Sequence, residues 1–158
     1  MLSEFDDEVG QAEAAEQAYL TGGDLASLDV ATAIWQGIIS RPSFDLAPLD
    51  VQSSMLYKAS RVLLRHYGAR GTDQDLHPAF EAGQRAMHKM TPDSADLPKV
   101  LINLGNVLTA RYAQTRRAED LEGAIAMYRR ALEAPALDPI DLPKCLGNLG
   151  GALGTRYG

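Results

Sequence analysis

The sequence predicts an all-α protein, a right-handed α-solenoid of antiparallel helix pairs. Two observations predict this fold. One segment recurs 45 residues further along: residues 96–113 read DLPKVLINLGNVLTARYA and residues 141–158 read DLPKCLGNLGGALGTRYG, with eleven of eighteen positions identical. Within each copy, apolar residues recur at intervals of three and four, which places them on one face of a helix. A helix pair cannot bury such a face alone, so neighbouring pairs must stack.

The repeat extends toward the start of the chain. At the offset of 45, Tyr67 corresponds to Tyr112, and a shift of 48 places Tyr19 on Tyr67. We therefore expect one domain over residues 1–158 with about 3.5 repeats. The expected units cover residues 3–40, 50–90, 96–134 and 141–158, the last one incomplete. The seven expected helices cover residues 3–20, 25–40, 50–68, 73–90, 96–114, 118–134 and 141–157.

Helix starts and helix contacts leave their own signals. Asp96 and Asp141 each precede a Leu-Pro pair, and a capping acid followed by proline in the first turn is typical of a helix start. Gly105 and Gly150 fall inside helices, where a glycine costs about 1 kcal/mol. We expect both glycines to allow a close approach of the paired helix.

Composition narrows the function classes. The hydrophobic fraction of 46% and the charged fraction of 23% are those of a folded soluble protein. A net charge of −6 argues against non-specific binding to nucleic acid or membranes. The acidic start does not resemble a secretory signal, and no apolar stretch is long enough to span a membrane. Cys145 has no second cysteine to pair with, which fits a reducing compartment. We expect a cytoplasmic protein.

Catalysis is the least favoured interpretation. His66, His77 and His88 are spaced by 11 residues, and a helix would hold the last two about 16 Å apart, too far to share an ion. His66 aligns with Arg111 and is expected on the surface. Cys145 aligns with Val100 and is expected to be a small buried side chain. The sequence thus predicts no catalytic residue, no metal and no cofactor. A helical enzyme or metal protein is the least favoured of three functional interpretations, and the other two are given below.

The repeat also resembles a known family. Residues 101–108 read LINLGNVL and residues 124–131 read AIAMYRRA, which resembles the tetratricopeptide repeat (TPR), with its W-x2-L-G-x2-Y and A-x3-F pattern. The unit here has 45 residues against about 34 in the usual repeat. Such long units are similar to actinobacterial and fungal arrays that accompany CHAT domains. The resemblance implies a superhelical stack with the first helix of each pair on the concave side.

A polar row lies opposite the apolar stripe of these first helices. Lys99, Asn103 and Asn106 are spaced i, i+4 and i+7 on one face, and the row recurs in two other units. Lysine can bind a carboxylate, and asparagine can both donate to and accept from a peptide backbone. The alternatives are solvated side chains and, for the asparagines, ties between adjacent helices. The candidate partner-binding residues are Lys58, Arg61, Arg65, Lys99, Asn103, Asn106, Lys144 and Asn148.

These features predict a protein–protein interaction scaffold. The concave groove would hold a peptide or protein segment, either acidic or ending in a C-terminal carboxylate, within a larger regulatory protein. The alternative is a sensory or autoinhibitory repeat module of a signalling or effector protein, such as a CHAT protease-like protein, an ATPase or a transcription regulator. The last helix keeps an apolar face without a partner helix, which favours a longer natural array or self-association through Leu146, Leu149 and Leu153.

Overall fold

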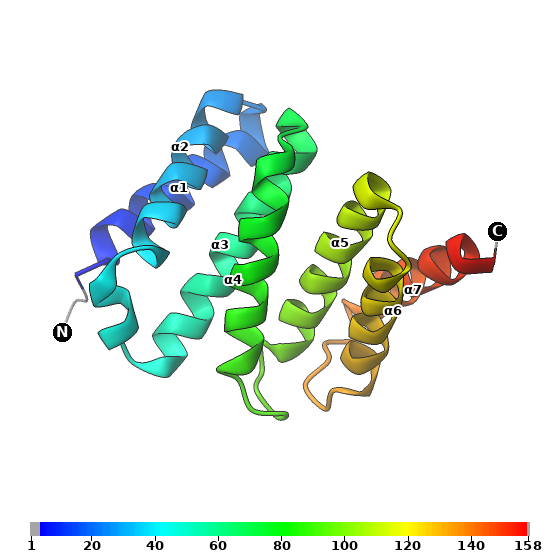
Figure 1. Cartoon of the computed structure of the whole chain (residues 1–158). Coiled ribbons are helices and arrows are strands. Elements are labelled where there is room, and N and C mark those ends of the chain that lie inside the picture. Colours follow the sequence, from blue (N-terminus) through cyan, green and yellow to red (C-terminus); the bar gives the residue numbers. More distant parts are fainter. Residues whose placement is uncertain (1–3, 158) are drawn as a thin grey trace. The chain divides into compact units, whose positions relative to one another are not determined.

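A computed structural model describes residues 4–157, and this part of the chain is helical, without a strand. Residues 4–157 form seven α helices, which Figure 1 labels in chain order: α1 (Asp6–Gly22), α2 (Leu25–Ile39), α3 (Leu49–Arg70), α4 (Leu76–His88), α5 (Leu97–Thr115), α6 (Ala118–Glu133) and α7 (Leu142–Tyr157). The predicted all-α fold with seven helices is confirmed. Residue 3, where the first helix was expected to begin, lies outside the described residues. None of the helices within 4–157 is both long and apolar enough to cross a membrane.

The helices form two compact units, Met1–Ala79 and Phe80–Gly158. In the first unit, α1 and α2 run antiparallel side by side, and α3 packs on α2 (Figure 1). In the second unit, α5 and α6 form the corresponding antiparallel pair, while α7 packs on α6 and also contacts α5. Adjacent helices therefore pack together within each unit. The right-handed winding and the single continuous repeat domain stay predictions.

The repeated tyrosines mark one structural position. Three helices end three residues after their tyrosine, and the next residue has left-handed backbone and donates its N–H to the tyrosine carbonyl oxygen. The donors and acceptors are Gly23 and Tyr19, Gly71 and Tyr67, and Arg116 and Tyr112. Glycine adopts this conformation without strain. Arg116 has φ 57° and is the non-glycine residue with positive φ among residues 4–157.

Helix starts differ from the prediction in two places. A short 3-10 helix η2 (Asp73–Asp75) precedes α4, so that α4 begins at Leu76 and not at residue 73. Asp96 holds the N-cap position of α5, but its side chain makes no capping hydrogen bond; the expected cap is wrong there, because its backbone is already helical, at φ −91° and ψ −8°. A second 3-10 helix, η1 (Pro42–Leu46), was not predicted.

Gly105 of α5 and Tyr128 of α6 pack closely against each other. A Cβ atom added at Gly105 would lie 2.3 Å from Cε1 of Tyr128, so the ring packs directly on the backbone of α5. The predicted role of this glycine is confirmed. Nothing in the described chain lies within 4 Å of a Cβ added at Gly150, and residues 4–157 include no second helix paired with α7, so the prediction stays untested at that position. Cys145 is buried as expected, with its Sγ 3.5 Å from the carbonyl oxygen of Tyr128.

The apolar face of α7 is covered only in part. Leu146 is 50% exposed, in agreement with the expectation of an uncovered end. Leu149 and Leu153 are instead partly buried, because they pack against the core shared by α5, α6 and α7. Self-association through this face stays a prediction, and Leu146 is the residue that could support it.

Candidate functional site

The three predicted cations of α3 form ion pairs with α1. Lys58 Nζ lies 2.7 Å from Oε1 of Glu13, and Arg61 lies 2.9 Å from Oε1 of Glu16. Arg65 binds the other oxygen of Glu16, whose side chain is buried. The acidic residues of the first helix thus neutralise this row, which leaves it poorly suited to attract an acidic segment.

A hollow between α1 and α3 is also poorly suited to an acidic segment. It has a volume of about 420 Å³ and is lined by Asp6, Val9, Asp50, Val51, Ser54, Met55 and Lys58. Two of its side chains are carboxylates, and its lysine is the one already paired with Glu13. The hollow lies between the first helices of two successive pairs, where the sequence predicted a groove, but its charge is not basic.

The second unit has a groove in the corresponding place, between α5 and α7. The groove has a volume of about 390 Å³ and is lined by Asn106, Thr109, Tyr112, Leu121, Tyr128, Gly147, Asn148, Gly151, Ala152 and Thr155. Two of the predicted binding residues, Asn106 and Asn148, therefore line one groove together. Leu121 and Tyr128 come from α6, which packs against both other helices.

Hydrogen bonds fix the orientation of the two asparagines. Oδ1 of Asn106 accepts a hydrogen bond from the hydroxyl of Tyr128 at 2.7 Å and another from Nδ2 of Asn148 at 3.0 Å. The predicted tie between adjacent helices is therefore present. It leaves the Nδ2 donors of Asn106 and the Oδ1 acceptor of Asn148 without a partner among residues 4–157. A donor and an acceptor on neighbouring helices match the C=O and N–H of a peptide backbone.

The other predicted residues of this unit flank the groove or lie away from it. Lys99 and Lys144 are exposed, and neither forms an ion pair with any residue in the range 4–157. Lys99 lies two turns before Asn106 on the same face of α5, and Lys144 lies one turn before Asn148 on α7. Asn103 is only 7% exposed and does not line the groove.

Sequence reasoning missed the small residues that open this groove. Gly147, Gly151 and Thr155 line it from α7, and a Cβ added at either glycine would meet nothing within 4 Å in the described chain. Their spacing of four residues is a stripe on one helix face, which was the available signal. The ring of Tyr128 is buried, and its hydroxyl reaches the edge of the groove.

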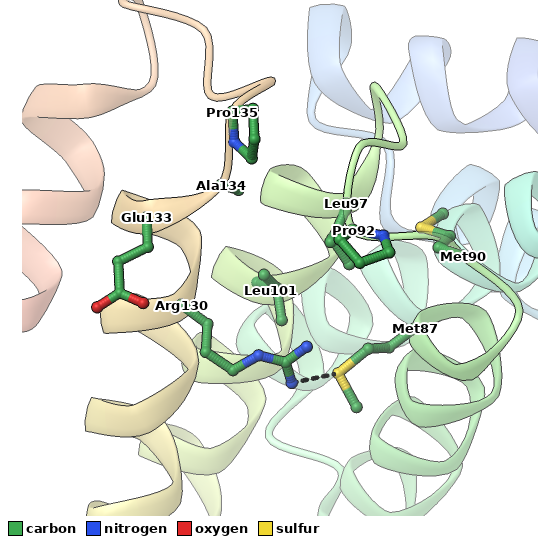
Figure 2. A pocket seen from close by; sticks show the side chains of 9 residues that line it. All are labelled: Met87, Met90, Pro92, Leu97, Leu101, Arg130, Glu133, Ala134 and Pro135. Carbon is green, nitrogen blue, oxygen red and sulfur yellow. Dashed lines mark hydrogen bonds between the residues drawn. The ribbon is translucent and has the colours of Figure 1, made fainter.

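A second hollow in the same unit lies near the ends of α4 and α6 (Figure 2). It was not foreseen from the sequence, since its walls come from three helices and two connecting loops. Nη1 of Arg130 lies 3.2 Å from Sδ of Met87 across this hollow. A guanidinium therefore lies over a thioether, which is a weak acceptor.

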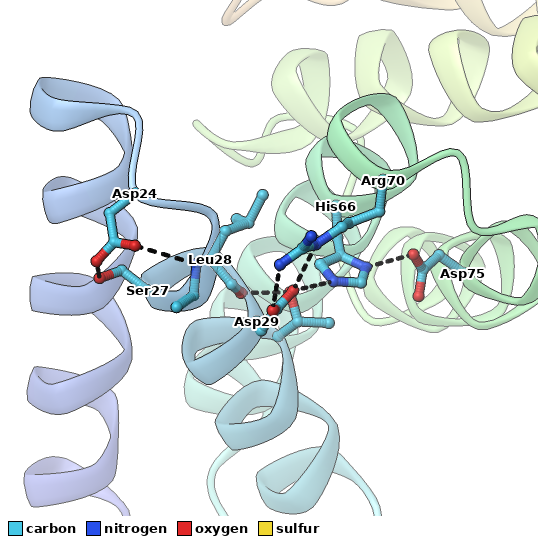
Figure 3. A network of polar contacts seen from close by, with 9 residues as sticks. Asp24, Ser27, Leu28, Asp29, His66, Arg70 and Asp75 are labelled. Atoms are coloured by element: carbon cyan, nitrogen blue, oxygen red, sulfur yellow. Dashed lines mark hydrogen bonds and ion pairs between the residues drawn. The ribbon is translucent and has the colours of Figure 1, made fainter.

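His66 is the centre of a polar network in the first unit (Figure 3). Its Nδ1 lies 2.5 Å from Oδ2 of Asp75, and its Nε2 lies 2.8 Å from Oδ1 of Asp29. Arg70 donates to both oxygens of Asp29. The expectation of a surface histidine is wrong, because only 15% of the His66 side chain is exposed: two elements, α2 and η2, enclose it.

The charges around His66 alter its titration. Burial lowers the pKa of His66, but the hydrogen bonds and negative charges of Asp75 and Asp29 outweigh burial, and the pKa lies above its ordinary value. The hydrogen bonds from Arg70 and His66 hold the pKa of Asp29 below its ordinary value. His66 therefore bridges two aspartates from different elements, and both aspartates favour its protonated form.

Comparison with known proteins gives no further guide. No protein-family model and no curated protein sequence matches this chain. Within residues 4–157, no three side chains of His, Cys, Asp or Glu are grouped so that they could hold a metal ion.

Proposed function

We propose that this chain is a TPR-like repeat module that binds an extended protein segment in the groove between α5 and α7. The observation that carries the proposal is the pair of groove-lining amides, Asn106 and Asn148, whose orientation is fixed by Tyr128. A right-handed superhelix of 45-residue repeats, acting as a scaffold in a larger regulatory protein, fits the recurrence of the sequence pattern.

The groove favours a segment recognised through its backbone. Its lining combines amide and hydroxyl groups with the apolar surfaces of Leu121 and Ala152. Fixed amides lose little conformational freedom on binding, which preserves affinity. Lys99 and Lys144 would attract a carboxylate beyond the amides, while the paired cations of α3 would not. The preferred ligand is therefore an extended segment with at most one or two acidic residues.

Affinity selection from a random peptide library on the immobilised chain tests this proposal. The selected peptide is then titrated by calorimetry against two variants, Gly151→Leu and Gly150→Leu. Both positions lie in α7 with open space around the Cβ, but only Gly151 lines the groove. Leucine at position 151 would fill part of the groove, so the affinity should fall by at least about tenfold, or 1.4 kcal/mol.

Gly150→Leu is the matched control, since the same side chain is added one residue away from the groove lining. Its affinity should equal that of the unmodified chain. Equal affinities of all three proteins would place the bound peptide elsewhere and reject the proposal. A selection that enriches no peptide sequence would reject it as well.

A further inference from the structure

The hollow near the ends of α4 and α6 has an apolar floor. It has a volume of about 230 Å³, and its floor includes Met87, Met90, Leu97 and Leu101 (Figure 2). Leu97 and Leu101 are nearly buried, at 6% and 1% exposed. Methionine is flexible and polarizable and adapts to different apolar shapes. The volume is below the usual range of about 300–1,000 Å³ for drug-sized ligands, so the hollow suits a short aliphatic chain.

Arg130, an exposed residue of α6, supplies the positive charge at this hollow. Its guanidinium extends toward Met87 in Figure 2, and Nη1 donates to the Met87 sulfur at 3.2 Å. Glu133 also lines the hollow, but its carboxylate points away from Arg130 in Figure 2. Across residues 4–157, Arg130 has no carboxylate within ion-pair distance. Guanidinium groups bind carboxylates through two parallel hydrogen bonds, and a thioether does not replace them.

We propose that this hollow is a second binding site, for a ligand that joins a short aliphatic chain to a carboxylate. The chain would lie against Met87, Met90 and Leu101, and the carboxylate would bind the Arg130 guanidinium. The ligand would replace a weak N–H···S contact with charge-assisted hydrogen bonds and remove apolar surface from water. The site is separate from the groove between α5 and α7, and it does not depend on peptide binding there.

Methyl NMR of the whole chain, labelled with ¹³C at the methionine methyl groups, tests this site. The probes are hexanoate and N-acetyl-leucine, which represent a free acid and a peptide terminus, each titrated to millimolar concentrations. Both present the same chemistry, and the tighter of the two identifies the natural source. We expect the Met87 and Met90 signals to move, while Met55, buried in the first unit, stays in place as an internal reference.

Two comparisons isolate the role of the charge. Hexanamide and N-acetyl-leucinamide keep the aliphatic chain without the carboxylate and should bind at least about fivefold more weakly. Arg130→Gln should weaken binding of the acids by a similar factor. Arg129→Gln is the matched control, because Arg129 is an exposed neighbour that does not line the hollow.

Three outcomes would overturn the proposal. In the first, neither acid moves the Met87 and Met90 signals. In the second, the amides bind as tightly as the acids. In the third, the Arg130→Gln variant binds the acids as tightly as the unmodified chain does. The Gly151→Leu variant should leave this titration unchanged. The experiments can therefore reject the proposed peptide groove between α5 and α7 and the proposed site at Arg130 independently of each other.

Discussion

His66 Nε2 lies 2.8 Å from Oδ1 of Asp29, and the same kind of interhelical pair recurs in the second unit. At the equivalent positions, Arg156 of α7 lies 3.0 Å from Glu122 of α6. Arg111, which also aligns with His66, lies 3.8 Å from Asp120, the counterpart of Asp75. The repeat thus places a cation beside an acid of a neighbouring element, and at one of these positions the cation is His66, which lies between two acids.

Stability should depend on pH through His66. Because the folded-state pKa of His66 is raised above its ordinary value of 6.5, its contribution is fully present below about pH 6.5 and is lost as the pH rises through the raised pKa. The free energy of unfolding, measured by urea denaturation, should therefore be lower at pH 9 than at pH 6. The lowered pKa of Asp29 affects stability only at acidic pH, where the free energy of unfolding falls as the pH drops through the pKa of Asp29.

His66→Arg is the control for this pH dependence. Arginine occupies the equivalent positions 111 and 156 and stays charged over the whole range. The variant should keep its urea midpoint between pH 6 and pH 9 nearly constant. A variant that loses as much stability as the unmodified chain over this range would show that another group titrates.

Gly105→Ala and Gly150→Ala should have opposite effects on stability. The added methyl at position 105 would overlap Tyr128 and destabilise the protein by about 1–3 kcal/mol. At position 150 the methyl meets open space, and the higher helix propensity of alanine should stabilise the protein by about 0.5–1 kcal/mol. Thermal unfolding of both variants measures the difference. Effects of the same sign at both positions would contradict the close contact of α5 with Tyr128.

Glu16 should contribute more to stability than Glu13. Glu16 is buried and binds both Arg61 and Arg65, so Glu16→Gln leaves two half-buried cations without a carboxylate, at a cost of about 1–3 kcal/mol. Glu13 binds Lys58 at an exposed position, and Glu13→Gln should cost about 0–1 kcal/mol. Urea denaturation compares the two variants. Equal costs would mean that burial of Glu16 does not strengthen its ion pairs.

Arg116→Gly should stabilise the end of α5. Arg116 has φ 57°, a conformation that costs a side-chain-bearing residue about 1–2 kcal/mol and that glycine adopts freely. Gly23 and Gly71 already hold this position in α1 and α3. The variant should unfold at a higher temperature, by an amount that reflects up to about 1 kcal/mol. An unchanged or lower midpoint would show that the Arg116 contact with the Tyr112 ring offsets the strain.

The fold could be predicted because its signals are local. The spacing of Leu101, Leu104 and Leu108 gives the apolar stripe of a helix, and the offset of 45 locates each helix from another copy. The ends of the helices were harder to predict, since they depend on capping contacts. Asp96 is a residue type that caps helices, yet its side chain makes no capping hydrogen bond. No local sequence pattern predicts the 3-10 helix η2, which occupies the positions where α4 was expected to begin.

The candidate site was only partly predictable, because the ion pairs and hydrogen bonds of its side chains depend on residues from other helices. Asn106 and Asn148 were identified from their places in the polar row of the first helices, and both line the groove. The same row on α3 carries Lys58 and Arg61, whose partners come from α1 and lie 45 residues earlier. The hollow beside Arg130 combines residues from several segments, so no single stretch of sequence reveals it.

Hydrogen–deuterium exchange tests the central claim most directly. The chain is measured alone and saturated with a peptide selected from a random library, and protection is followed along every helix. We expect the bound peptide to slow exchange in residues 104–113 of α5 and 146–155 of α7 and to leave exchange in α3 unchanged. Protection confined to α1 and α3, or to none of the helices, would contradict the assignment of the groove between α5 and α7.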